Sequence, residues 1–186
     1  MEVQFSSMQK FFFLIVLFIF SSSFSYTPNN EPSIPFHINP NGDEYIEGIN
    51  NDFESRLLQL INERRRKRGL VPLELHDDLM RASRYHAADM ANENYHEHAT
   101  YNRGKYGLQV GMSTFKRISK FYDGFANTEN IAAGYGSPEH VLIGWMQSPG
   151  HRKNLFNKSA THMGVGYYHN TQSEYGHYWV FESAVQ

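Results

Sequence analysis

Histidine is the residue type with the most chemical potential in this sequence. The 186-residue chain contains 10 His and no Cys. The absence of thiols excludes disulfides, thiolate nucleophiles and cysteine-based zinc sites. Neutral imidazole binds metals, and it exchanges a proton near neutral pH. The histidine content therefore predicts metal or proton chemistry, and the fold must decide which of these side chains meet.

His96, Glu97 and His98 form a dense local cluster. If this segment is extended, His96 and His98 share one face. A zinc protease instead places two His four residues apart on a helix, with a Glu between them. The segment lacks that pattern, so we interpret it as an exposed pair. His86 lies on an apolar helical stripe, where a hydrogen-bonded packing role is expected.

Composition favours one folded domain and argues against some partners. Aromatic residues make up 15% of the chain, which suits a packed core, and the formal net charge is -2. This balance gives no general attraction to nucleic acid or to an anionic membrane. We therefore predict a monomer that does not bind nucleic acid.

Residues 1–25 have the parts of a secretory signal peptide. Lys10 precedes an apolar run over residues 11–20, and a serine-rich stretch ends at Ser25, where we expect cleavage. Translation could start at Met1 or Met8, and the alternative to cleavage is a retained anchor. A Pro/Asn-rich linker is predicted over residues 26–50 and a domain over 51–186. The product is predicted to be secreted (periplasmic in a Gram-negative cell), with no stable membrane anchor after cleavage.

Hydrophobic periodicity predicts helices followed by strands. Helices are expected from an N-cap at Asp52 to residue 68, and over residues 77–91, 114–121 and 138–147. The Ser-Pro-Gly sequence at 148–150 is expected to end the last helix, which leaves Arg152 and Asn154 in a loop. Residues 163–168 and 177–182 predict two strands of an antiparallel hairpin. The fold class is therefore α+β, with helices covering a sheet.

Four motifs in order give the sequence a family resemblance. They are His86–Ala91 with Glu97–Thr100, Glu129–Gly134, Trp145–Arg152, and Met163–Gly166 with Tyr178–Phe181. Together they resemble the CAP superfamily of cysteine-rich secretory proteins, antigen-five allergens and pathogenesis-related proteins, in its short cysteine-free bacterial form. The similarity runs from about Phe53 to Glu182. It implies an α-β-α sandwich with a central antiparallel sheet.

The resemblance also implies a cleft lined by two His and two acidic residues, which binds a divalent cation in some members. The matching positions here are His98, Glu129 and His151, while Ser148 stands where the second acid is expected. Two neutral imidazoles and one carboxylate suit zinc, with water as a fourth ligand. The alternative is a hydrogen-bonded polar cleft that holds no metal.

Two functions remain open from the sequence. The first is a secreted, non-catalytic binding module for a small apolar ligand, a glycan or an extracellular protein, and it assigns no catalytic residue. The second is a hydrolase in which Glu129 is a general base and a metal or imidazole polarises the substrate. Under that alternative, Ser148 could pair with His151 as a nucleophile, although a small residue in a helix-terminating turn is the better explanation of this serine.

Overall fold

Helices and strands are interleaved along the chain, instead of helices first and strands last, in a computed structural model that describes residues 39–185. In order they are α1 (Asn51–Arg66), β1 (Glu74–Leu75), α2 (Asp77–Glu93), β2 (Thr100–Gly104), β3 (Gly107–Met112), α3 (Thr114–Phe121), β4 (Phe125–Ala133), α4 (Pro138–Gln147), α5 (Pro149–Leu155), β5 (His162–His169) and β6 (His177–Val185). The predicted signal peptide and most of the predicted linker lie outside the described residues.

Side-chain caps fix where the long helices begin. Asn50 Oδ1 accepts a hydrogen bond from Phe53 N at 3.0 Å, so α1 begins at Asn51 and the predicted N-cap at Asp52 is wrong by two residues. His76 Nδ1 accepts from Asp78 N at 3.2 Å at the start of α2. Asn94 ends α2 with a left-handed backbone (φ 54°). The predicted helix over 114–121 is confirmed with the same bounds.

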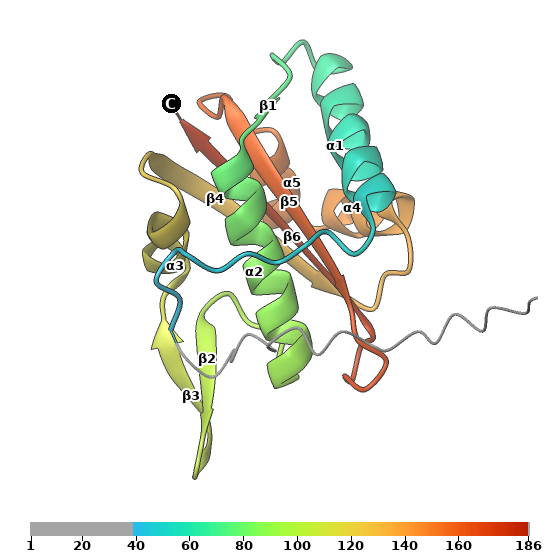
Figure 1. Cartoon of the computed structure of the whole chain (residues 1–186). Helices are drawn as coiled ribbons and strands as arrows, with labels where there is room; N and C mark the ends of the chain where they lie inside the picture. Colours follow the sequence, from blue (N-terminus) through green and yellow to red (C-terminus); the bar gives the residue numbers. More distant parts are fainter. Residues whose placement is uncertain (1–38, 186) are drawn as a thin grey trace, which may run out of the picture. The chain divides into compact units, whose positions relative to one another are not determined.

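The central sheet has four strands in the order β1-β5-β6-β4. The predicted hairpin of β5 and β6 is confirmed, with His162 opposite Ala184 and His169 opposite His177. Strand β4 pairs antiparallel with β6 and places Glu129 opposite Glu182. The two-residue edge strand β1 runs parallel to β5, so the sheet is antiparallel except at this edge. Strands β2 and β3 form a separate hairpin that extends away from the sheet (Figure 1).

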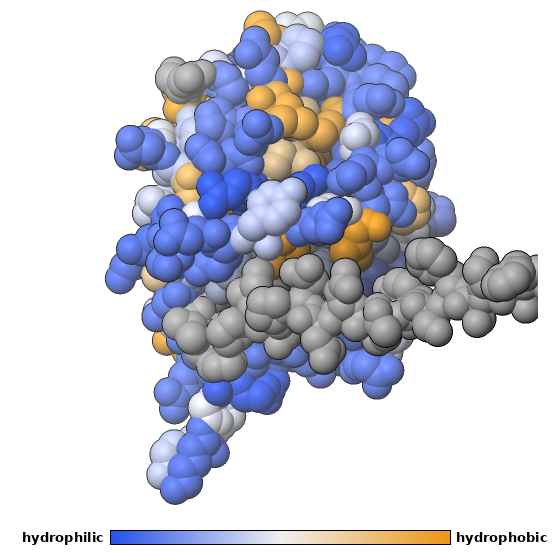
Figure 2. Space-filling view, in the orientation of Figure 1, coloured by the Kyte–Doolittle hydropathy of each residue, from blue (hydrophilic) through white to orange (hydrophobic). Residues whose placement is uncertain are grey.

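Helices cover both faces of the sheet, which gives the expected α-β-α sandwich (Figure 1). Helix α2 packs directly on β5 because Gly164 and Gly166 leave room for its backbone. On the opposite face, α1 and α4 enclose a core in which Trp145 and Phe181 have ring centroids 6.2 Å apart. Hydrophilic residues dominate the face seen in Figure 2, with separate apolar patches.

The chain after α4 differs from the sequence-based expectation. Arg152 and Asn154 lie in helix α5, not in a loop, because Pro149 occupies the first turn of a new helix instead of only ending the previous one. Arg152 Nη1 does cap a carbonyl of α4, since it donates to Met146 O at 2.8 Å. Asn154 is helical and donates from Nδ2 to Glu129 O at 3.0 Å. Helix α5 is thereby attached to β4.

Residues 39–50 contain no helix or strand, but they pack against the domain. Ile46 is buried beside α2 and α3. Arg81 Nη2 donates to Gly42 O. The described part of the predicted linker is therefore anchored to the helices. Within residues 39–185, no helix has the length and apolar character needed to cross a membrane.

Candidate functional site

A strand, a helix and a connecting segment converge on one carboxylate, Glu129. This residue lies in the middle of β4 and is 5% exposed. His98 comes from the segment between α2 and β2, and its Nδ1 lies 2.7 Å from Glu129 Oε1. Arg117 comes from α3 and contacts the other carboxylate oxygen, Oε2. The sequence-predicted His98 and Glu129 are therefore in direct contact.

Arg117 links the two carboxylates on adjacent strands. Its side chain is completely buried, and Nη2 also lies 3.4 Å from Glu182 Oε1 on β6. Ser83 Oγ on α2 donates to Glu182 Oε2 at 3.2 Å. The other terminal nitrogen, Nη1, donates to the backbone oxygen of His98 at 2.8 Å. One guanidinium thus fixes both the carboxylate and the segment that carries the imidazole.

The charges at the site follow from this network. Burial alone would raise the pKa of Glu129, but Arg117 and the His98 hydrogen bond outweigh it and lower the pKa to about 2. The hydrogen bond to Glu129 raises the pKa of His98. Burial raises the pKa of Glu182 to about 8, against the opposing charge of Arg117. Arg117 and Glu129 are therefore an ion pair, while burial favours the protonated form of Glu182.

His151 lies on α5 close to this network. Asn130 Nδ2, on β4, donates to His151 O at 3.0 Å and holds the helix against the strand. Burial lowers the pKa of His151, and the charges of His98 and His96 lower it further, so these imidazoles are near one another. Across the described residues, no three His, Asp or Glu side chains are arranged to hold a metal ion.

The hydrogen bonds decide which atoms could face a metal. One carboxylate oxygen of Glu129 contacts His98 and the other contacts Arg117. Glu129 therefore suits the role of a residue that orients a metal-binding histidine without binding the metal itself. An ionised carboxylate can only accept, so His98 Nδ1 must carry the hydrogen, and the Nε2 lone pair is left free when the ring is neutral. The His98 side chain is 50% exposed. Glu129 therefore supports the His98 ring through Nδ1, and His151 on α5 is the other imidazole near this network.

The other predicted positions have simpler roles. His86 is fully buried, and its Nε2 lies 3.0 Å from Glu97 O, which confirms the packing role. Ser148 joins α4 to α5, and its side chain makes no capping hydrogen bond. Arg117 was missed by sequence reasoning. Its signal was a charged residue four positions before Phe121 and adjacent to Ile118, on the apolar side of a short helix.

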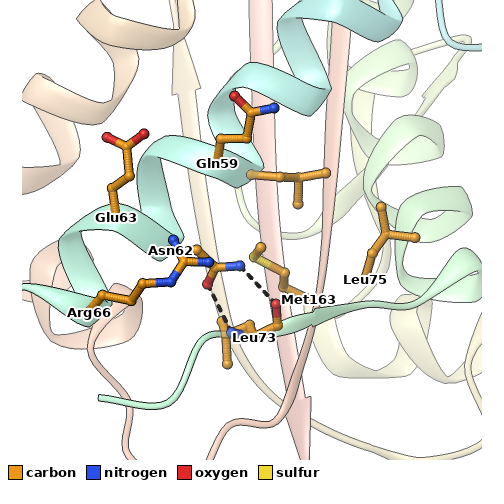
Figure 3. A pocket seen from close by; sticks show the side chains of 8 residues that line it. Gln59, Asn62, Glu63, Arg66, Leu73, Leu75 and Met163 are labelled. Carbon is orange, nitrogen blue, oxygen red and sulfur yellow. Dashed lines mark hydrogen bonds between the residues drawn. The ribbon is translucent and has the colours of Figure 1, made fainter. Parts of the chain in front are cut away.

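A separate pocket of about 380 Å³ lies between α1 and the β1 edge of the sheet (Figure 3). Leu58, Leu73 and Met163 supply its apolar surface, and Glu63 and Arg66 lie at its polar side. Asn62 closes one wall through two hydrogen bonds to the Leu73 backbone, at 2.8 and 2.9 Å. Strand β4, which carries Glu129, is at the opposite edge of the sheet. The pocket is therefore distinct from the His98–Glu129 site.

Related sequences and structures agree with this architecture. The chain is 37% identical over 116 residues to the uncharacterized Bacillus subtilis protein YkwD, a match that covers 62% of this chain and 42% of YkwD. It is 34% identical over 126 residues to the uncharacterized Bacillus subtilis membrane protein YlbC, covering 67% of this chain and 34% of YlbC. The chain thus spans less than half the length of both relatives.

Solved structures show the same fold. An extracellular SCP-domain protein from Bacillus anthracis superposes with a TM-score of 0.61 at 28% identity, over 74% of this chain and 42% of the other. An outer surface protein from Borrelia burgdorferi gives 0.63 at 22% identity, over 75% of this chain and 98% of the other. The model of the cysteine-rich secretory protein family matches residues 58–183. The chain therefore belongs to the cysteine-rich secretory protein (CAP) family.

Proposed function

We propose that the protein is an extracellular binding module whose His98 and His151 imidazoles bind a divalent cation, with zinc the best match. The observation that carries this proposal is the contact between Glu129 and His98 Nδ1, which leaves Nε2 of a half-exposed side chain available to a ligand. A carboxylate behind a histidine is the usual support of a protein metal ligand. The extracellular location is supported by the extracellular and outer-surface proteins that share the fold.

Bound zinc would polarise a ligand oxygen or activate a water molecule at this position. The protein side chains perform the remaining tasks. Arg117 keeps Glu129 ionised and in place, and Glu129 fixes the orientation and tautomer of His98. Arg117 also fixes the segment that carries this histidine through its bond to His98 O. These contacts favour a preformed site that recognises an oxygen-containing group, such as one on a glycan or protein.

The hydrolase alternative gains no support from the same contacts. Both oxygens of Glu129 are engaged, and a pKa of about 2 makes this carboxylate a weak base at neutral pH. Among the described residues, no hydrogen bond joins the Ser148 hydroxyl to a histidine. A nucleophile needs a base within hydrogen-bond reach, and this pair does not show one. Small apolar ligands are better matched by the pocket beside Leu58 and Met163.

Calorimetric titration with zinc tests the metal site. We expect one zinc ion at the cleft, and loss of its binding in His98→Ala and in His151→Ala. Glu129→Gln should weaken binding about 10- to 100-fold because the amide supports the imidazole less well. His140→Ala is the matched control, since His140 is exposed on α4. Undiminished zinc binding by both His98→Ala and His151→Ala, with folding intact by circular dichroism, would refute the site.

A further inference from the structure

A second pair of histidines lies at the turn end of the β5–β6 hairpin. His169 ends β5, His177 begins β6, and the two are direct cross-strand partners. Asn170 N donates to Gly176 O at 2.8 Å, which makes His169 and His177 a pair of the non-hydrogen-bonded kind. Side chains approach most closely at such pairs. Accordingly, the two imidazole rings are stacked, with centroids 4.5 Å apart and planes 14° from parallel.

The His177 ring is held by a buried tyrosine. Tyr167 Oη lies 2.8 Å from His177 Nδ1, and Tyr167 is itself fixed between Trp179, at 4.4 Å between ring centroids, and Phe53, at 5.3 Å. This contact uses Nδ1 and leaves Nε2 without a hydrogen-bond partner among the described residues. The Tyr167 hydroxyl therefore sets the orientation of the His177 ring, as the Glu129 carboxylate does for the His98 ring.

Two glycines leave space beside both free nitrogens. A Cβ atom added at Gly136 would lie 3.6 Å from His177 Nε2, and one added at Gly176 would lie 4.0 Å from His169 Nε2. These are the nearest approaches at the two glycines, and among residues 39–185 no side chain other than the imidazole comes within 4 Å of either added Cβ, chain neighbours aside. The edges of the two rings thus border a small space that Gly136 and Gly176, which have no side chains, leave open.

The surroundings favour a neutral His177 ring. Within residues 39–185, no carboxylate forms an ion pair with His169 or His177. Burial, followed by the charge of His169, lowers the pKa of His177. Two adjacent imidazoles are suitable ligands for borderline transition metals through their Nε2 atoms, whereas calcium and magnesium require oxygen ligands. The Tyr167 hydroxyl can accept from His177 Nδ1, which is the tautomer that leaves Nε2 able to bind.

We propose that His169 and His177 chelate a divalent first-row transition ion, and that Cu²⁺ binds most tightly. The preference follows from the order of stability of such complexes with nitrogen ligands. The rings need only turn about their side-chain bonds to bring both Nε2 atoms to one ion, with water filling the other positions. His177 is five residues along β6 from Glu182, the cross-strand partner of Glu129, so the pair lies roughly 17 Å from the cleft.

Copper titration of the full chain tests this pair in a His98→Asn/His151→Asn background, which removes the cleft ligands. We expect one Cu²⁺ site, with an electron paramagnetic resonance spectrum that shows two imidazole nitrogens. Adding His169→Asn or His177→Asn should weaken binding roughly 100-fold, because each removes half of a chelate. Tyr167→Phe keeps the ring packing and should weaken binding about tenfold.

His162→Asn is the matched control, since His162 lies at the other end of β5 and should leave copper affinity unchanged. Unchanged copper affinity in both His169→Asn and His177→Asn would overturn the proposal. So would a spectrum with fewer than two imidazole nitrogens in the background variant, a result that does not depend on how the further variants fold. Loss of copper in the His162→Asn control would place the ion elsewhere and would also overturn it.

Discussion

Replacing Arg117 by methionine is expected to lower the free energy of unfolding by about 3–5 kcal/mol at pH 7. The guanidinium is completely buried and contacts Glu129 and Glu182, which are also buried. Methionine fills similar volume but carries no charge, so it leaves the Glu129 carboxylate without its cation. Breaking a buried ion pair from one side costs this much because the remaining charge stays desolvated. Urea unfolding of both chains measures the difference.

The pH dependence separates a charge effect from a packing effect. In the wild-type protein the pKa of Glu129 is about 2, below its ordinary value of 4.5, so its stabilisation is present above pH 4.5 and is lost as the pH falls toward 2. Without Arg117, burial should raise the folded-state pKa of both carboxyls above the unfolded value, and the penalty then grows as the pH rises. The stability gap should therefore shrink between pH 7 and pH 4.

Two further variants give this prediction its controls. Adding Glu182→Gln to Arg117→Met should change stability little at pH 7, since burial already favours the protonated Glu182 carboxyl and the amide removes no charge. Arg56→Met removes an exposed arginine from its ion pair with Glu139 and should cost less than about 1 kcal/mol. A gap that stays constant with pH would show that Arg117 stabilises the fold through packing alone.

The sequence predicted those helices and strands whose pattern of apolar residues matches the faces that are buried in the structure. The helix over 114–121 has apolar residues at helical spacing, and the β5–β6 hairpin has dense apolar and aromatic strands. Strand β4 was not predicted because consecutive residues Thr128, Glu129 and Asn130 are all buried. Alternation of polar and apolar residues marks a strand with one wet face, whereas residues 128–132 of β4 are buried on both faces.

The candidate site was predictable only in part for the same reason. Family resemblance selected His98 and Glu129, and the structure brings them into contact. Arg117 and Glu182 could not be added from the sequence, because an arginine in a short helix ordinarily points to solvent. Only the register of β4 with β6 places Glu182 beside Glu129, and such long-range pairing is not encoded in any local pattern.

The close approach of α2 to the sheet leads to the second large effect. A Cβ atom at Gly166 would lie 2.3 Å from Ser83 C and Ser83 O, and one at Gly164 would lie 2.2 Å from Leu79 C. These are backbone atoms in the middle of a buried helix, so they cannot turn aside as a flexible side chain can. Gly166→Ala must therefore push α2 away from β5. We expect it to lower the free energy of unfolding by about 3 kcal/mol, the upper end of ordinary overpacking costs.

Gly150→Ala is the matched control for this prediction, because a Cβ there meets no atom of the described part of the chain within 4 Å and the residue lies in helix α5. Alanine should be neutral or slightly stabilising at that position, since it favours helix more than glycine does. The Gly166→Ala substitution should also weaken the hydrogen bond from Ser83 Oγ to Glu182, because Ser83 lies in the turn of α2 that must move. Equal urea midpoints for Gly166→Ala and Gly150→Ala would mean that α2 can shift without cost, and the tight helix–sheet contact would then not determine the position of the site.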